Sequence, residues 1–137
     1  MVLIVGSGCE KPLKNIKKTT KVKINSSVIE VELADTKDKI QKGLSGRKKI
    51  CPDCGMLFIF PQKDIYSFWM KKMNFSLDII WINEDKIVEM VEGAQVPNGD
   101  NIPVYVPSKK ADKILEVNAG FCQKHDIKLG DKIIIYK

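Results

Sequence analysis

The stretch from Gly55 to Ile82 constrains the fold of this 137-residue chain more than any other segment. It reads GMLFIFPQKDIYSFWMKKMNFSLDIIWI, so aromatic, methionine and isoleucine residues are dense and few charges interrupt them. Side chains of these types are usually buried, and the aromatic and β-branched ones favour strands. The segment therefore predicts a sheet-rich core in which the charges of Lys71, Lys72 and Asp78 must be accommodated.

Turn-forming residues divide the remaining chain into short strands. Apolar and polar residues alternate on both sides of Asn25-Ser26-Ser27, which predicts a β-hairpin, and Asn83-Glu84-Asp85 predicts a second one. Strands are expected at 22–24, 28–33, 55–60, 65–73, 77–82, 86–91, 104–106, 113–117 and 132–136, and short helices at 37–42 and 119–125. This pattern predicts a mainly β (α+β) domain, a compact barrel-like sheet of about eight short strands with two short helices.

The positive charge of the chain is concentrated near its start. The formal net charge is +6, and residues 10–23 carry six lysines against one glutamate, which is +5. The rest of the chain is therefore close to neutral at +1. A folded domain that reads nucleic acid usually clusters Lys and Arg on one of its faces, so nucleic acid is not an expected partner.

The first residues, MVLIVGSG, are apolar or small and lead directly to Cys9. They resemble the end of a lipoprotein signal peptide, in which small residues precede a cysteine that is lipidated after cleavage. Gly6 stands where that pattern usually has an aliphatic residue, and a basic region and a full apolar region are missing before it. The alternative is a frayed tail with an incidental cysteine.

A lipidated Cys9 would give the lysine-rich segment a role, because basic residues beside an anchor are attracted to anionic lipid headgroups. We therefore expect a lipoprotein-like leader and linker at 1–23 and one globular domain at 24–137. The membrane surface is then an expected partner and the expected location is extracytoplasmic and membrane-anchored. A cytoplasmic protein is the alternative.

Three readings are open for Cys51 and Cys54, which are spaced C-x-x-C. A disulfide suits an exported protein. A zinc site would add Cys122 and His125, which are spaced C-x-x-H, although nothing in the sequence brings the two halves together. Thiol-disulfide catalysis is disfavoured because a strand, rather than a helix, is expected to follow the pair.

Six residues in or beside the apolar blocks are candidates for a ligand site: Arg47, Trp69, Lys71, Asp78, Glu116 and Asn118. Alternation along 68–73 places Trp69 and Lys71 on one face of an expected strand. One interpretation is a buried ion pair of Lys71 with Asp78 or Glu116. Another is a pocket in which Arg47 and Lys71 bind an anionic group beside Trp69. A glycosidase-like carboxylate pair from Asp78 and Glu116 is also open.

Several blocks of the chain together resemble one family. They are GLSGR at 43–47, GMLFIFP at 55–61, FWMKKMNFSLDIIWI at 68–82, LEVNAGF at 115–121 and IKLGDKI at 127–133. The chain is similar to the domain-of-unknown-function 192 family of small bacterial and archaeal proteins, many of which carry an export signal. The resemblance implies export and leaves the activity unassigned. It also implies that Cys51 and Cys54 are a local feature, because that position is not usually cysteine in the family.

These observations lead to one main functional expectation. The chain is expected to be a non-enzymatic, exported domain that needs no cofactor and binds a ligand or partner in the cell envelope through one face of a β-barrel. One alternative is a hydrolase-like enzyme that acts on an envelope component with Lys71, Asp78 and Glu116. Another is an intracellular zinc-stabilised module. The structural question is whether Lys71 and Asp78 meet each other or face an open pocket.

Overall fold

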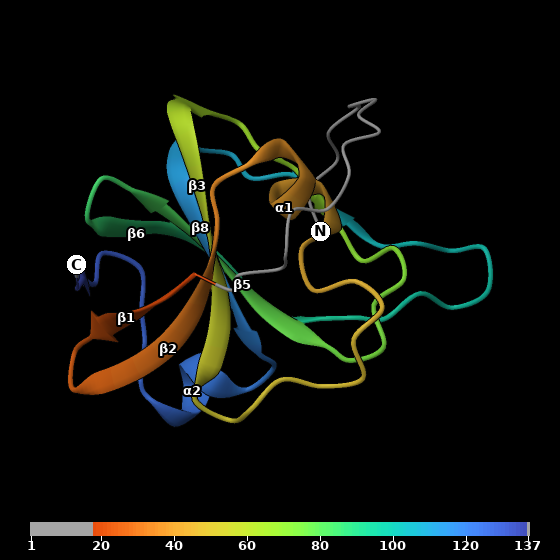
Figure 1. Cartoon of the computed structure of the whole chain (residues 1–137), viewed down its shortest axis with the longest axis horizontal. Coiled ribbons are helices and arrows are strands. Elements are labelled where there is room, and N and C mark those ends of the chain that lie inside the picture. Colours follow the sequence, from red (N-terminus) through yellow and green to blue (C-terminus); the bar gives the residue numbers. More distant parts are fainter. Residues whose placement is uncertain (1–17, 137) are drawn as a thin grey trace.

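A strongly curled seven-stranded sheet forms most of the fold in the computed structural model, which describes residues 18–136 (Figure 1). The strands of this sheet are β1 (Thr19–Ile24), β2 (Ser27–Ala34), β3 (Cys54–Asp64), β5 (Leu77–Asn83), β6 (Lys86–Ala94), β8 (Ala111–Asn118) and β9 (Ile133–Ile135), in the order β6-β5-β8-β3-β2-β1-β9. A small second sheet pairs β4 (Phe68–Trp69) with β7 (Val104–Tyr105). The helices are α1 (Lys37–Lys42) and α2 (Phe121–Lys124).

The two ends of the large sheet approach each other at one corner. The Ile87 N–H donates to the carbonyl oxygen of Asp131 at 3.0 Å, and the Ile133 N–H donates to that of Asp85 at 2.7 Å. These bonds join the start of β6 to the chain just before and within β9, so the sheet curls into a half-barrel. The prediction of a mainly β, barrel-like fold with two short helices is confirmed.

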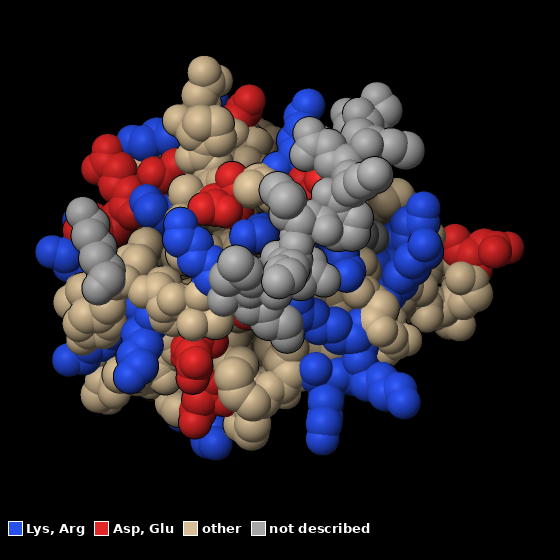
Figure 2. All heavy atoms as spheres, in the orientation of Figure 1, with Lys and Arg blue, Asp and Glu red and all other residues tan. Residues whose placement is uncertain are grey.

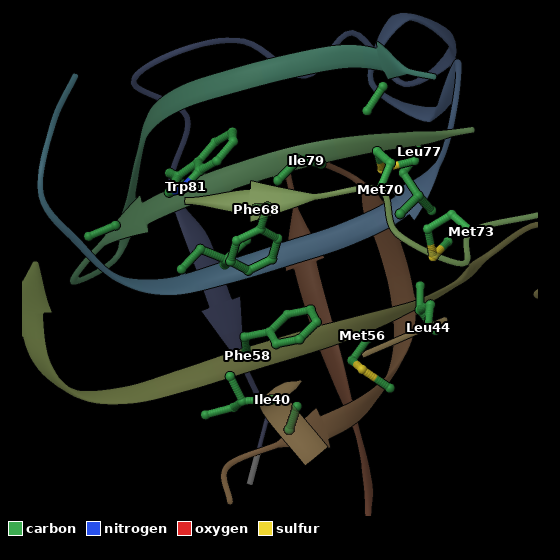
Figure 3. Close-up of a cluster of buried hydrophobic side chains, with 14 of the residues drawn as sticks. Ile40, Leu44, Met56, Phe58, Phe68, Met70, Met73, Leu77, Ile79 and Trp81 are labelled. Carbon is green, nitrogen blue, oxygen red and sulfur yellow. The ribbon is translucent and has the colours of Figure 1, made fainter. Parts of the chain in front are cut away.

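Apolar side chains cover both faces of the large sheet. On the first face, residues such as Met56, Phe58, Ile79, Trp81 and Ile114 belong to one buried cluster (Figure 3). On the second face, the intervening residues belong to another: Leu57, Ile80, Ile82, Leu115 and Val117. The near-continuous apolar run of β5 follows from this arrangement, because both of its faces are buried. Within residues 18–136, no helix is long and apolar enough to cross a membrane.

Each helix covers one of these faces. Strands β2 and β3 are parallel, so the chain between them must cross back over the sheet, and α1 lies in that crossover. The Thr36 hydroxyl oxygen accepts from the Lys39 N–H at 3.3 Å, and α1 buries Ile40 on the first face. Helix α2 buries Phe121 and Cys122 on the second face.

The expected strand at 65–73 is wrong. Only Phe68–Trp69 is a strand, and the chain then turns at Lys71 and Lys72, where Lys72 has a φ of 60°. The Met73 N–H donates to the Met70 carbonyl oxygen at 3.1 Å, and both methionine side chains are buried. Because these residues form a turn, the alternation that was expected to orient Trp69 and Lys71 is absent.

Two strand boundaries also differ from expectation. Strand β3 continues past Pro61 to Asp64, where residues 61–64 are exposed, so the proline sits on a solvent-facing extension of the strand. Strand β1 begins at Thr19 and pairs with β2, so residues 19–23 belong to the sheet and not to the linker. Cys9 and most of the lysine-rich segment lie outside the described residues.

Candidate functional site

A hollow of about 320 Å³ lies between β2, the start of β3 and the loop at 43–53. It is lined by Thr19, Glu30, Val31, Glu32, Arg47, Lys49, Ile50, Cys51, Cys54 and Gly55. We call this space the hollow. Of the six residues predicted for a ligand site, only Arg47 lines it. Glu30, Glu32 and Lys49 are additional charged residues that the sequence analysis did not select.

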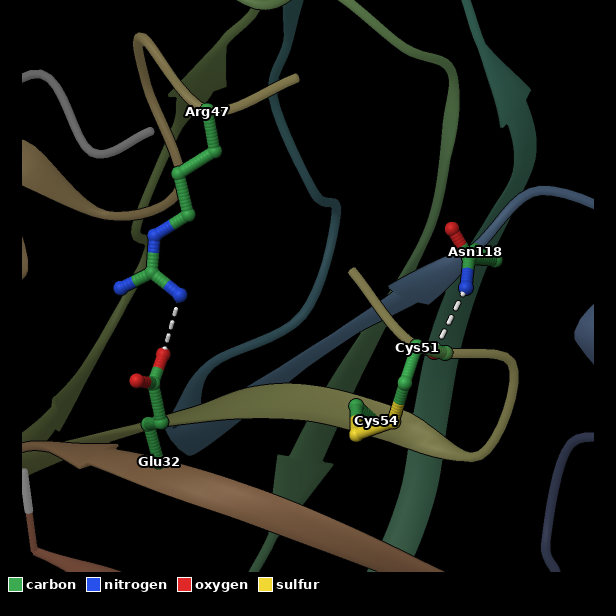
Figure 4. Close-up of a disulfide and its surroundings, with 5 residues drawn as sticks. All are labelled: Glu32, Arg47, Cys51, Cys54 and Asn118. Carbon is green, nitrogen blue, oxygen red and sulfur yellow. Dashed lines mark hydrogen bonds and ion pairs between the residues drawn. A yellow bond between two sulfur atoms is a disulfide. The ribbon is translucent and has the colours of Figure 1, made fainter. Parts of the chain in front are cut away.

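Arg47 is held in place by its side chain and by its backbone. One of its Nη atoms donates to a Glu32 carboxylate oxygen at 2.5 Å (Figure 4). The Asn74 amide donates to the Arg47 carbonyl oxygen at 3.0 Å, and the neighbouring Gly46 N–H donates to that of Lys72 at 2.8 Å. The ion pair is 30% and 18% exposed in its two side chains, so it orients Arg47 more than it stabilises the fold.

Among the residues that the structure describes, the formal charges around the hollow balance. Two carboxylates, from Glu30 and Glu32, line it together with two cations, from Arg47 and Lys49. In Figure 2 basic side chains gather at the lower right, over the part of the molecule where the 43–53 and 70–76 loops run in Figure 1. The acidic side chains of the hollow come from β2.

The loop beside the hollow carries a disulfide between Cys51 and Cys54, whose Cα atoms are 5.1 Å apart (Figure 4). Three further bonds hold this loop. The Cys51 carbonyl oxygen accepts from the Cys54 N–H at 3.1 Å and from the Asn118 amide at 3.0 Å, and the Asp53 carbonyl oxygen accepts from the Glu30 N–H at 2.9 Å. Closing so short a loop is expected to add only about 2 kcal/mol to stability. The loop therefore does not depend on the disulfide alone.

Gly55 explains why β3 and β8 approach closely beside this loop. A Cβ atom at Gly55 would lie 2.5 Å from the Glu116 carbonyl oxygen and 3.1 Å from a Val117 methyl carbon. Only a residue without a side chain permits this contact. The close approach brings Cys54, at the start of β3, next to Asn118, at the end of β8.

Asp78 is fully buried and accepts hydrogen bonds from two backbone N–H groups. One carboxylate oxygen accepts from the Gly93 N–H at 2.9 Å, and the other accepts from the Cys122 N–H at 3.0 Å. The first bond stabilises an irregular pairing of β5 with β6, and the second caps the first turn of α2. Lys71 is elsewhere, with its Nζ 4.8 Å from the centre of the Trp69 ring. The expected Lys71–Asp78 ion pair is therefore not formed.

Glu116 is also fully buried, but on the other face of the sheet. Glu116 is paired with Met56 and Ile79, which belong to the first face, whereas Asp78 is paired with Val117, which belongs to the second. The two carboxyl groups are thus separated by the sheet. Neither the carboxylate pair nor an enzyme pocket that combines Lys71, Asp78 and Glu116 is formed, because strand register places these residues apart.

Burial raises the pKa of the Glu116 carboxyl above its usual value of 4.5. When the pKa of a carboxyl is raised on folding, the folded protein loses stability as the pH rises from the pKa of the unfolded state through that of the folded state. Glu116→Gln removes this titration. We expect the urea midpoint of Glu116→Gln, minus that of the wild type, to increase as the pH is raised above about 4.5. The exposed Glu92→Gln is the control, and a pH-independent difference for Glu116→Gln would contradict the assignment.

The four residues considered for zinc are not gathered. Cys51 and Cys54 are joined to each other, and Cys122 is buried under α2, where burial, followed by the Asp78 carboxylate, raises the pKa of its thiol. His125 bonds through Nδ1 to the Ser27 hydroxyl at 2.9 Å. Across residues 18–136, no three His, Cys, Asp or Glu side chains are placed to hold a metal ion. The structure thus does not bring together the four residues that the zinc alternative requires.

A comparison with protein families identifies the family of this chain. The DUF192 family, described as "Uncharacterized ACR", matches residues 19–135, which is nearly all of the described chain. The chain belongs to the DUF192 family. The resemblance predicted from the sequence blocks is confirmed, and no curated protein matches the chain.

Two solved structures are similar to this DUF192 domain over most of its length. One is a "putative transcription regulator" from Sinorhizobium meliloti 1021, with a TM-score of 0.80, 26% sequence identity, and coverage of 87% of this chain and 95% of that one. The other is a protein of unknown function from Novosphingobium aromaticivorans DSM 12444, with a TM-score of 0.77, 26% identity, and coverage of 94% and 93%. These similarities support the half-barrel fold.

Proposed function

We propose that this DUF192 domain is a binding protein and that the hollow is its ligand site. The proposed ligand is a small zwitterion of the size of an amino acid or a dipeptide. The observation that carries the proposal is the balance of two carboxylates and two cations around about 320 Å³ of space. A volume near the lower end of the range for ligand pockets, about 300–1,000 Å³, favours a small molecule.

The contacts of Arg47 suggest how such a ligand would be oriented. Glu32 fixes the guanidinium but uses one of its N–H donors, and a guanidinium carries five. A ligand carboxylate would accept from the remaining donors of Arg47 and from Lys49. The ammonium group of the ligand would then lie toward Glu30. Ile50 and the disulfide would supply the less polar wall of the site.

Calorimetric titration with dialanine tests this proposal. We expect Arg47→Gln to weaken dialanine binding about tenfold or more, because it removes a charge-assisted contact worth roughly 1.5–3 kcal/mol. N-acetyl-dialanine and dialanine amide, which each lack one charge, should also bind more weakly than dialanine. Lys63→Gln is the matched control, since Lys63 is an ion-paired cation on β3 outside the hollow.

The comparison among ligands and variants also defines failure. Equal affinities of wild type and Arg47→Gln, with both folded by circular dichroism, would remove the site from the hollow. Equal affinities for dialanine and its two blocked forms would show that the site does not recognise the two charges of a zwitterion. Absence of binding to all three compounds would contradict the proposal as a whole.

We further propose that the domain works outside the cytoplasm as a membrane-anchored protein. The support is Cys9 with its small-residue and lysine-rich surroundings, together with a disulfide at Cys51 and Cys54, since disulfides persist in oxidising compartments. The lysines would add attraction to anionic lipid headgroups. Mass spectrometry of protein from its native membranes should find Cys9 modified by lipid, and an unmodified Cys9 in the soluble fraction would contradict this location.

We do not extend the proposal to hydrolysis, because Asp78 and Glu116 lie on opposite faces of the sheet. We also do not propose nucleic acid as the ligand, although the similar Sinorhizobium protein is described as a "putative transcription regulator". The charges around the hollow balance, and outside residues 10–23 the chain has a net charge of only +1. Both features fit a small zwitterion better than a polyanion.

A further inference from the structure

We infer that the Cys51–Cys54 disulfide is redox-active and exchanges with dithiols, and that the Cys51 sulfur is the one attacked. This activity is distinct from the proposed binding of a zwitterion. It shares Lys49 and the disulfide with the wall of the hollow but needs no ligand there. The inference follows from how the loop is held, which sulfur is accessible, and which charges lie beside it.

The first argument is that the loop keeps its shape by other means. The Cys54 N–H and the Asn118 amide both donate to the Cys51 carbonyl oxygen, and the Glu30 N–H donates to that of Asp53. These bonds fix both ends of the loop while the sulfur atoms take no part in them. Reduction would therefore leave the two thiols close together and ready to close again. A structural disulfide more often joins segments that would otherwise separate.

The second argument is that the two sulfur-bearing residues differ in access. Cys51 is exposed at the rim of the hollow, whereas Cys54 is partly buried as the first residue of β3. A thiolate from solution would reach Cys51 first, which makes Cys54 the leaving group. Cys122 is buried, so it is shielded from the same reagents.

The third argument concerns the charges around the departing sulfur. Arg47 and Lys49 line the same hollow as Cys54, and nearby cations stabilise a thiolate. Glu30 and Glu32 also line it and oppose this effect, but Glu32 is paired with Arg47. Lys49 is therefore the cation that we assign to stabilising the Cys54 thiolate.

The reaction balances with a dithiol as the reductant. One thiolate of the dithiol attacks the Cys51 sulfur, the Cys51–Cys54 bond breaks, and the electron pair leaves on Cys54 as a thiolate. The second thiolate of the dithiol then attacks the dithiol's other sulfur, which is bonded to Cys51 in the mixed disulfide, and Cys51 leaves as a thiolate. The dithiol is oxidised to a disulfide, the protein gains two electrons, and the two protons of the dithiol end on Cys51 and Cys54.

Trapping of the mixed disulfide tests which sulfur is attacked. The oxidised full chain carrying Cys9→Ser is treated briefly with reduced glutathione, quenched with acid and alkylated, and its peptides are analysed by mass spectrometry. Glutathione should be found on Cys51 about tenfold more often than on Cys54, because the attacked sulfur carries the glutathione and the other one leaves. Equal amounts on the two residues, or more on Cys54, would overturn the assignment of Cys51 as the attacked residue.

An equilibrium measurement tests whether the pair is redox-active at all. The Cys9→Ser protein is incubated in glutathione buffers of graded ratio and in dithiothreitol, and its free thiols are then counted by alkylation. We expect oxidised and reduced forms to coexist in the glutathione series, with the circular dichroism spectrum retained on reduction. A disulfide that stays closed at every glutathione ratio, or a domain that unfolds when it opens, would overturn the inference. Neither assay contains dialanine, so failure of the binding proposal leaves these results unaffected.

Discussion

Asp78→Ala is expected to lower the free energy of unfolding by about 2–4 kcal/mol, among the largest effects of any single substitution in this domain. The carboxylate is fully buried and accepts from the N–H groups of Gly93 and Cys122. Its removal leaves both donors buried without a partner, at a pairing irregularity of β6 and at the start of α2. Urea unfolding followed by circular dichroism measures the loss.

Two further variants separate a lost structural bond from a lost charge. Asp78→Asn keeps the shape and one acceptor, so it should lose less stability than Asp78→Ala. Asp100→Ala, at an exposed loop position, should change the free energy of unfolding by no more than about 0.5 kcal/mol. Wild-type stability in Asp78→Ala would show that Asp78 is not the structural group described here and would return it to the candidates for a ligand site.

Gly55→Ala is expected to destabilise the domain by about 3 kcal/mol, although it adds a single methyl group. That methyl carbon would lie 2.5 Å from the Glu116 carbonyl oxygen, and a backbone atom of a central strand cannot move aside as a flexible side chain can. Strands β3 and β8 would have to separate where Cys54 lies next to Asn118. Thermal and urea unfolding should both show the loss, and the Asn118 bond to Cys51 should weaken with it.

Gly99→Ala provides the contrast for this substitution. Gly99 has a φ of 59° and no atom within 4 Å of an added Cβ, so alanine there costs only the backbone conformation, about 1–2 kcal/mol. Gly55 lies outside the left-handed region, so its cost is steric. If Gly55→Ala were no more destabilising than Gly99→Ala, the close approach of β3 to β8 would be wrong.

Local sequence signals predicted the parts of the fold that depend on local contacts. The polar–apolar alternation and the turn at Asn25-Ser26 predicted the β1–β2 hairpin, and the structure pairs Val22 with Ile29 across it. Helix α1 spans the expected residues 37–42 between Thr36 and Gly43, because the cap and the stop of a helix are set by residues within one turn.

The turn at Lys71 and Lys72 was missed because its apolar residues resemble those of a strand. Met70 and Met73 are three residues apart and both face the first-face core, which a turn allows and an extended strand does not. A local pattern cannot distinguish these possibilities when every second or third residue is apolar. Because residues 65–73 were predicted to be a strand, Lys71 was placed where it could pair with Asp78, which the structure does not show.

The charged lining of the hollow was missed for a different reason. Glu30 and Glu32 alternate with buried residues of β2, which correctly indicates that they face away from the second-face core. The parallel pairing of β2 with β3 then carries the 43–53 loop back over them, and this pairing joins segments more than twenty residues apart. Sequence alone showed Arg47 as a candidate but not the carboxylate that orients it.

The separation of Asp78 from Glu116 likewise depends on register. Each lies in an apolar strand, and only the pairing of β5 with β8 determines whether their side chains share a face. Once that register is known, Asp78 is a structural acceptor. Of the charged residues predicted for a ligand site, Arg47 is the one that lines the hollow.

The central claim is that the hollow binds a small zwitterion, and an NMR titration of the uniformly ¹⁵N-labelled domain with dialanine tests it most directly. We predict chemical-shift changes that saturate with dialanine and centre on the backbone amides of Arg47, Lys49, Ile50, Cys51 and Gly55, which line the hollow. The same titration of Arg47→Gln should require at least about tenfold more dialanine. Saturable changes centred on α2 or on the second face, or no saturable change at all, would contradict the claim.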